Sequence, residues 1–301
     1  MATVTLPVVF EQLVSGLAIG GVYALVALGF ALIFGVMRVA QFAHGEVAML
    51  GAFLALALLP ALPAVGGARF ALALAAALLL GAMVGAVIER TVFRPLTGSP
   101  AVAPIIAAVG LSILLQYLAA DLWGAEFHSF ALGWYPGNLT LGWVSLPVFK
   151  VIILGAALGL LAALHLLLTR SRLGRAIRAT AADAETAQLM GVDTARTTAV
   201  TFAIGSALAG AAGVLVAGLY GVAYSSMGVP MLVKGYTATV IGGLGSLTGA
   251  VAGGLLLGVT EFMLESYGSP RWSDTIVFAL LIALLVLRPH GLLGQVAPER
   301  L

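Results

Sequence analysis

Apolar runs long enough to cross a membrane constrain this chain of 301 residues more than any other feature of its sequence. A helix needs about 20 predominantly apolar residues to span a bilayer, and several runs reach that length. The runs cover residues 8–36, 47–62, 70–88, 101–120, 147–168, 197–220, 236–263 and 275–287. Because 61% of the chain is hydrophobic, a soluble fold would expose apolar surface and aggregate. The sequence therefore predicts an all-α integral membrane protein, a single polytopic helical bundle over 1–301.

Glycine interrupts the run at 236–263. Residues 242–249 read GGLGSLTG, and glycine at this density disfavours a straight helix. We expect two half-helices that meet at a break, either as a re-entrant segment or as a hairpin. The number of hydrophobic segments is then roughly eight, or nine if a hairpin counts twice.

A second break, at 37–46, reads MRVAQFAHGE and separates the first two runs. Backbone groups without helical partners are tolerated at membrane depth only inside protein or facing a cavity, so both breaks are candidates for lining a translocation path. A cytoplasmic turn is an equally good interpretation of 37–46. The candidate path residues are Gln41, His44, Gly45, Glu46, Gly242, Gly243, Gly245 and Ser246.

Basic residues set the expected orientation, because cytoplasmic loops are enriched in Lys and Arg. If the loops at 37–46, 89–100 and 169–196 and the tail from residue 288 are inside, ten basic residues are cytoplasmic. The four that remain outside are Arg69, Lys150, Lys234 and Arg271. The N-terminus is then outside and the C-terminus is cytoplasmic.

This orientation makes the loop at 123–146 periplasmic. The loop is rich in aromatic residues, which favour the boundary between membrane and water. They are Trp123, Phe127, Phe130, Trp134, Tyr135 and Trp143.

The loop at 169–196 is the longest polar passage in the chain and carries five arginines. It predicts a short helix over 181–190. Thr180 and Asp183 have the spacing of a capping box, and Gly191 stands where a left-handed residue would end the helix. One interpretation is a connector whose arginines face the cytoplasm. The other is a surface helix that docks into a partner protein, where a glutamate at Ala184 or Ala187 would weaken docking.

Motifs for catalysis and metal binding are missing from the sequence. The chain has no cysteine and only four histidines, so we expect neither a disulfide nor a metal site. It has no Walker A motif, so any ATP that drives transport is bound by another chain. Ionisable residues at membrane depth are the default functional candidates, and they form no ladder of carboxylates typical of a secondary carrier. These residues are Glu11, Arg38, His44, Glu46 and Glu261.

Four passages of the sequence resemble one family. They are LVALGFALIFGVMRVAQFAHGEVAMLGAF, RPLTGSPAVAPIIAAVGLSILLQ, GRAIRATAADAETAQLMGVD and YTATVIGGLGSLTGAVAGGLLLG. In this order they are similar to the LivH-type permease subunit of branched-chain amino acid ABC importers. The resemblance implies a type II-like importer permease in a bacterial inner membrane. It also implies that this subunit is not itself an enzyme.

The resemblance further implies partners and a role for the polar loop. The implied partners are a second, LivM-like permease, two cytoplasmic ATPase subunits that bind ATP and Mg, a periplasmic substrate-binding protein and membrane lipid, without nucleic acid. No cofactor is expected in this chain. The family's coupling segment, which sits in a groove of the ATPase, corresponds here to Gly174, Arg175, Arg178, Thr180, Asp183, Ala184, Glu185, Ala187 and Gly191. Two alternatives stay open: a permease of this family for urea or short amides, and an autonomous carrier or channel. Whether the chain pairs with itself or with a related permease also stays open.

Overall fold

The computed structural model describes residues 6–63, 66–100, 102–134, 136–141, 144–268, 270–288 and 291–294. Seven of the described helices are long and apolar enough to cross a membrane. They are α1 (Leu6–Met37), α2 (His44–Leu58), α3 (Gly66–Ile88), α4 (Val102–Trp123), α5 (Val148–Arg170), α8 (Thr194–Tyr220) and α10 (Leu247–Tyr267). The chain is therefore a multi-pass membrane protein, and the predicted all-α polytopic fold is confirmed.

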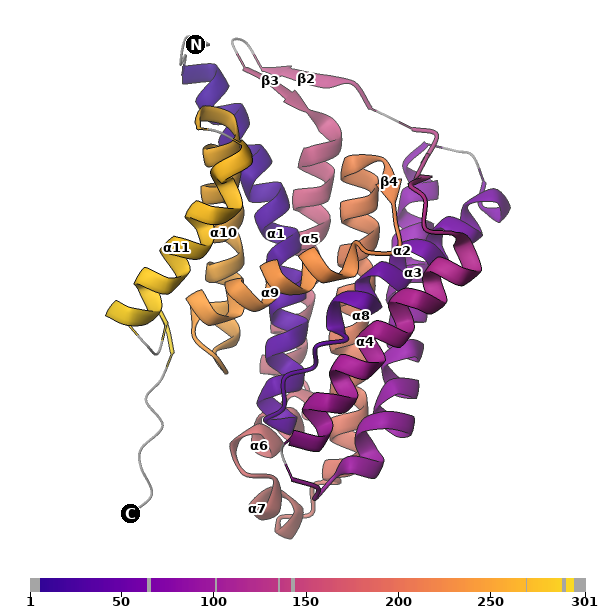
Figure 1. Ribbon diagram of the computed structural model, residues 1–301, viewed down its shortest axis with the longest axis vertical. Helices are drawn as coiled ribbons and strands as arrows, with labels where there is room; N and C mark the ends of the chain where they lie inside the picture. The colour runs from indigo at the N-terminus through magenta and orange to yellow at the C-terminus, as the bar shows by residue number, and fades with distance from the viewer. Residues whose placement is uncertain are drawn as a thin grey trace.

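Shorter elements connect these helices. The helical ones are η1 (Leu59–Ala61), the π-helical turn η2 (Glu89–Phe93), η3 (Arg94–Leu96), α6 (Arg172–Ala182), α7 (Ala184–Leu189), α9 (Gly228–Gly242) and α11 (Pro270–Leu287). The strands are β1 (His128–Ser129), β2 (Asn138–Leu141), β3 (Val144–Pro147) and β4 (Val222–Ala223). β2 and β3 form an antiparallel hairpin, and β1 pairs with β4 in the same sense. The α6–α7 pair and the β2–β3 hairpin lie at opposite ends of the bundle (Figure 1).

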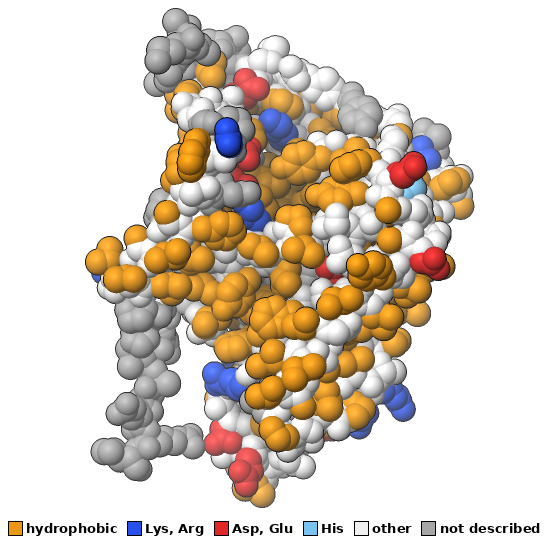
Figure 2. Space-filling model, viewed as in Figure 1, with side chains coloured by type: hydrophobic (Ala, Val, Ile, Leu, Met, Phe, Trp, Pro, Cys, Tyr) orange, Lys and Arg blue, Asp and Glu red, His pale blue; other side chains and the backbone are white. Residues whose placement is uncertain are grey.

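Helix α1 runs through the centre of the bundle and packs against α5, α8, α9 and α10. Helices α2, α3 and α4 lie on one side of it, and α10 and α11 lie on the other (Figure 1). The face shown in Figure 2 is mostly apolar over its middle, as expected for a surface that meets lipid. Charged side chains gather near its two ends and at a hollow in its upper half (Figure 2).

Glycines allow the central helices to approach closely. A Cβ atom on Gly20 of α1 would lie 3.0 Å from the carbonyl oxygen of Gly254 in α10. Gly81 and Gly85 of α3 meet the backbone or side chain of Ser206 in α8. Small residues four apart are typical of such membrane crossings. In the similar pair in α5, Gly155 and Gly159, an added Cβ atom would meet no heavy atom within 4 Å.

The predicted glycine break is confirmed, but the helix before it is longer than expected. Helix α9 ends at Gly242 and α10 begins at Leu247, and Gly243 and Gly245 between them have φ angles of 111° and 87°. These angles lie in the left-handed region that favours glycine. The residues between the apolar runs, 221–235, were expected to form a loop, and this is wrong for 228–235 because α9 already begins at Gly228. Its Pro230 is in the first turn, where no helical hydrogen bond is lost.

Helix α9 lies across the bundle instead of along it (Figure 1). It has 15 residues, too few to span a bilayer, and it packs against α1, α2 and α10. Together α9 and α10 form a short helix, a glycine break and a helix of spanning length. Lys234, which was expected in an outer loop, is instead buried in α9.

The aromatic loop is only partly at the surface. Phe127 is exposed, but Phe130 is buried in the core, and its backbone N–H donates to the carbonyl oxygen of Gly221 at 2.8 Å. Trp134 lies against Gly67 at the start of α3. Tyr135 and Trp143 lie outside the described residues, as does Arg300 of the expected cytoplasmic tail.

Candidate functional site

The polar loop folds into two short helices, and the predicted capping box is wrong. Helix α6 begins after Ser171, whose hydroxyl oxygen accepts from the N–H of Gly174 at 2.8 Å. The Arg178 guanidinium group also donates to the carbonyl oxygen of Leu168 at the end of α5. Thr180 is inside α6, where its hydroxyl donates to the carbonyl oxygen of Ala176 at 2.9 Å. Spacing alone suggested the cap at Thr180, but α6 starts earlier in the chain.

Helix α7 is capped by Asp183, whose carboxylate accepts from the N–H of Thr186 at 3.0 Å. The left-handed residue expected at Gly191 is confirmed, with φ of 86°. Leu189 and Met190 at the end of α7 are 83% and 81% exposed, although both are large and apolar. An exposed apolar tip on a polar loop is typical of a surface that binds another protein. Sequence reasoning missed both residues.

The nine residues expected in the coupling segment do not share one surface. Arg175, Arg178, Ala184, Glu185 and Gly191 are exposed, Asp183 is half-buried, and Gly174, Thr180 and Ala187 are buried. Ala187 is only 5% exposed within this chain alone. A glutamate at Ala187 would therefore disturb the fold of the loop itself. The expectation that this substitution tests docking is wrong for Ala187, because the loop would be disturbed whether or not a partner binds.

Arg38 joins the polar loop to the break after α1. Its φ angle of 57° is unusual for a residue other than glycine, and it ends α1 sharply. Its guanidinium group donates to the carbonyl oxygen of Ala181, near the end of α6, at 2.8 Å. The two residues are 143 positions apart in the sequence. This hydrogen bond therefore links the end of α6 to the segment that leads to α2.

The break at 37–46 is not a surface turn, because the chain rises from the end of α1 into the bundle before α2 begins (Figure 1). Gln41, His44 and Glu46 are almost completely buried. One carboxylate oxygen of Glu46 accepts from the Ser112 hydroxyl at 3.3 Å. Gly45 and Glu46 also pack against Gly228, at the N-terminal end of α9. The positive end of the helix dipole faces this carboxylate.

Helix α9 thus connects the two breaks. The break at 37–46 meets its N-terminal end, and the glycine break forms its C-terminal end. The glycine break is itself tightly packed, since Gly242 contacts Gly249. The carbonyl oxygen of Gly242 also accepts from the N–H of Leu293 at 2.9 Å. None of the eight candidate path residues lines either of the two cavities described next.

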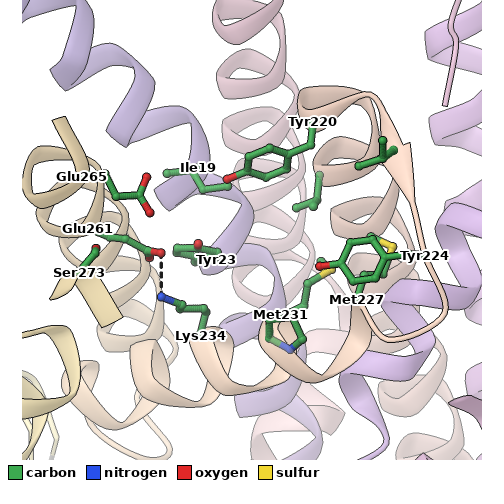
Figure 3. Close-up of a pocket in the computed structure, with 13 residues that line it drawn as sticks. Ile19, Tyr23, Tyr220, Tyr224, Met227, Met231, Lys234, Glu261, Glu265 and Ser273 are labelled. Atoms are coloured by element: carbon green, nitrogen blue, oxygen red, sulfur yellow. Dashed lines mark hydrogen bonds and ion pairs between the residues drawn. The ribbon is translucent and has the colours of Figure 1, made fainter. Parts of the chain in front are cut away.

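A cluster of polar residues from α1, α8, α9 and α10 lines a cavity of about 480 Å³, here called the charged cavity. Lys234 of α9 donates to an oxygen of Glu261 of α10 at 2.7 Å, and both side chains are 10% exposed. Figure 3 shows Tyr23 of α1 beside this ion pair and Glu265 one turn further along α10. The side chains of Met227 and Met231 lie on the opposite side (Figure 3). Charged and apolar groups therefore share one cavity.

Sequence reasoning found only part of the charged cavity. Glu261 was a candidate because it is ionisable at membrane depth. Lys234, Tyr23, Tyr220, Tyr224 and Ser273 were missed. Lys234 carried a usable signal, because it is one of only two lysines in the chain and stands between apolar neighbours.

A second cavity, of about 610 Å³, lies next to the polar loop. Its lining includes Arg38, Thr180 and Ala184, together with Glu89 and Arg94 of the η2–η3 turn. It therefore brings the end of α1, the polar loop and the start of α8 to one place.

Comparison with known proteins gives independent evidence of the family. Residues 12–285 match the model of the family described as "Branched-chain amino acid transport system / permease component". The chain is 37% identical to the high-affinity branched-chain amino acid transport system permease protein BraD of Pseudomonas aeruginosa, over 96% of this chain and 97% of BraD. It is 35% identical to the LivH permease protein of Escherichia coli over the same shares of the two chains. A probable LivH of Methanocaldococcus jannaschii is 28% identical over 90% of this chain and 88% of the relative.

Proposed function

The chain belongs to the branched-chain amino acid transport system permease family, and we propose that it forms part of the membrane path of an ATP-driven importer for branched-chain amino acids. It is a permease component and not the subunit that hydrolyses ATP. The working assembly holds a second related permease, two cytoplasmic ATPase subunits that bind ATP and Mg²⁺, and a periplasmic substrate-binding protein. The chain lies in a bacterial inner membrane with its N-terminus outside, and it needs no cofactor of its own.

One observation supports the assembly most strongly: the exposed apolar tip of the polar loop at Leu189 and Met190. The tip lies at the end of the bundle opposite the β2–β3 hairpin (Figure 1). A soluble ATPase that covers it would remove both side chains from water, which favours binding. The loop is then the surface through which ATP hydrolysis in another chain moves this one.

The hydrogen bond from Arg38 to Ala181 suggests how such motion reaches the membrane region. Displacing α6 pulls on Arg38 and on the break at 37–46, which packs against the N-terminal end of α9. Helix α9 carries Lys234 and forms one wall of the charged cavity. The path from the polar loop to the charged cavity is therefore a chain of direct contacts.

Replacing Arg38 with asparagine is expected to uncouple ATP hydrolysis from transport. Asparagine tolerates the left-handed backbone but cannot reach Ala181. Leucine transported per ATP should fall about tenfold, the scale of a typical coupling energy between two sites. The comparison is with Arg90→Ala, which removes an exposed arginine of the η2 turn. An unchanged ratio of leucine to ATP in Arg38→Asn would contradict this coupling route.

Cells that lack their own branched-chain amino acid uptake provide the test of substrate. This chain is expressed in them together with the partner permease, ATPases and binding protein of its transport system. Uptake of labelled leucine should be restored, and unlabelled isoleucine and valine should compete for it. Uptake of urea without leucine would contradict the proposed substrate while leaving the permease assignment intact.

A further inference from the structure

The charged cavity contains groups that complement every part of a free apolar amino acid. We infer that it is a transit site, in which the ammonium group of the amino acid binds Glu261 and its carboxylate binds the hydroxyls of Tyr220 and Tyr224. The inference rests on the proposed function, and it adds a specific binding site within this one chain. The transported molecule then pauses on α9 and α10 on its way through the membrane.

The ammonium end is defined by Glu261. One of its carboxylate oxygens accepts from Lys234, while the other, Oε2, is buried and has no hydrogen-bond partner among the described residues. Ser273 also lines the cavity, and its hydroxyl oxygen is likewise buried without a hydrogen-bond partner among the described residues. Buried polar atoms in proteins almost always have partners. A ligand ammonium group, with three N–H donors, would satisfy both atoms at once.

The carboxylate end is defined by tyrosines. Figure 3 shows the rings of Tyr220, at the end of α8, and Tyr224, after β4, with their hydroxyl groups pointing into the cavity toward α10. A phenolic hydroxyl donates a hydrogen bond without adding a charge. Two such donors bind a carboxylate less tightly than an arginine fork, so the molecule is recognised but still released.

An apolar wall completes the site. Met227, Pro230 and Met231 face the cavity with Val216 of α8 and Ile19 of α1. Methionine adapts to ligands of different shape, which suits a site that accepts several branched side chains. The volume of about 480 Å³ is also in the range of small-molecule sites.

A purely structural role does not account for the Lys234–Glu261 pair. Buried ion pairs in proteins seldom stabilise the fold more than apolar residues of the same size. Ionisable residues at membrane depth mark the routes of polar substrates and ions. The pair joins α9 to α10 and also lines the charged cavity, so a ligand in the cavity would lie beside it.

Direct binding tests the transit site. The purified complex of this chain, its partner permease and the ATPases, without the binding protein, is titrated with labelled leucine. Saturable binding is expected in the wild type. Glu261→Gln should weaken it about tenfold, since it removes a charged hydrogen-bond acceptor while preserving shape. Tyr117→Phe, which changes an exposed tyrosine on α4 outside the cavity, should bind as the wild type does.

Two competitors, each carrying only one of the two charged groups of leucine, test the two ends of the site separately. Isoamylamine carries the ammonium group alone, and 4-methylpentanoate carries the carboxylate alone. Glu261→Gln should lose competition by the amine, whereas the double variant Tyr220→Phe and Tyr224→Phe should lose competition by the carboxylate and keep the amine. The tyrosine variant retains both rings, so it tests the inference even if the glutamate variant does not fold.

Transport by the same preparations separates this inference from the proposed function. Wild-type uptake of leucine without saturable binding, or with unchanged binding in Glu261→Gln and in the tyrosine variant, would overturn the transit site and leave the proposed function standing. Binding that the variants weaken as described, in a complex that shows no ATP-driven leucine uptake, would support the site and contradict the function.

Discussion

Replacing Leu189 and Met190 together with aspartate is expected to abolish co-purification of the ATPase subunits with this permease. Both side chains are more than four-fifths exposed, so their replacement removes little packing within the chain. In a docked complex each contributes about 1.5–3 kcal/mol if fully buried, and an unpaired carboxylate in its place opposes docking further. The ATPases should therefore dissociate from the permease when both are present at micromolar concentrations. The measurement is the yield of ATPase that is retained with a tagged permease.

Leu139→Asp is the matched control for that double variant. It makes the same chemical change at an exposed leucine of the β2–β3 hairpin, at the opposite end of the bundle. The ATPases should be retained at the wild-type yield. A double variant that also retains them would show that the tip of α7 is not the docking surface.

Gly258→Leu is expected to prevent stable folding of the permease. Gly258 of α10 lies against the backbone of Gly16 and Gly20 in α1, and the α1–α10 crossing is a central contact of the bundle. Overpacking of this kind costs about 1–3 kcal/mol where side chains can move aside, and here the opposing atoms are backbone. The expected result is aggregation, or a midpoint of thermal unfolding in detergent lowered by about 5 °C or more, since each 1 kcal/mol shifts the midpoint by about 2 °C in a protein of this size.

Gly110→Leu provides the comparison for Gly258→Leu. Gly110 is on the exposed face of α4, where an added Cβ atom would meet no heavy atom within 4 Å. Its replacement should leave the unfolding midpoint close to that of the wild type. If both variants unfolded at the wild-type temperature, close glycine packing would not be what holds α1 to α10.

The sequence predicted the fold where hydrophobicity alone decides the outcome. The first six apolar runs became helices of spanning length, and the glycine-rich passage at 242–249 became the break between α9 and α10. The last run, 275–287, lies in α11, which is not among the seven helices long and apolar enough to span. The resemblance to LivH-type permeases is confirmed by the family match over residues 12–285. These features are local in the sequence, so a pattern of residue types is sufficient to find them.

Helix α9 shows where that reasoning stops. Its first half holds Pro230 and Lys234, which lower the local hydrophobicity and suggest a loop. In the structure the proline is in the first turn and the lysine pairs with Glu261, 27 residues further on. A contact over that separation has no periodic signature, so the charged cavity could not be assembled from the sequence. The helix also lies across the bundle, a direction that hydropathy does not encode.

The polar loop gives a second example at smaller scale. Thr180 and Asp183 have the right spacing for one cap, but Ser171 competes for the same role earlier in the chain. The structure uses Ser171 for α6 and Asp183 for α7, which leaves Thr180 inside a helix. Helix boundaries depend on such competition between nearby caps, and the residue types alone did not decide it.

ATP-driven uptake in a purified system is the most direct test of the central claim. This chain, its partner permease, the ATPases and the binding protein are reconstituted in proteoliposomes with ATP on the side of the ATPases. Labelled leucine should accumulate against its gradient, and omitting the ATPases should stop it. Accumulation that continues without the ATPases would contradict the account and identify the chain as an autonomous carrier.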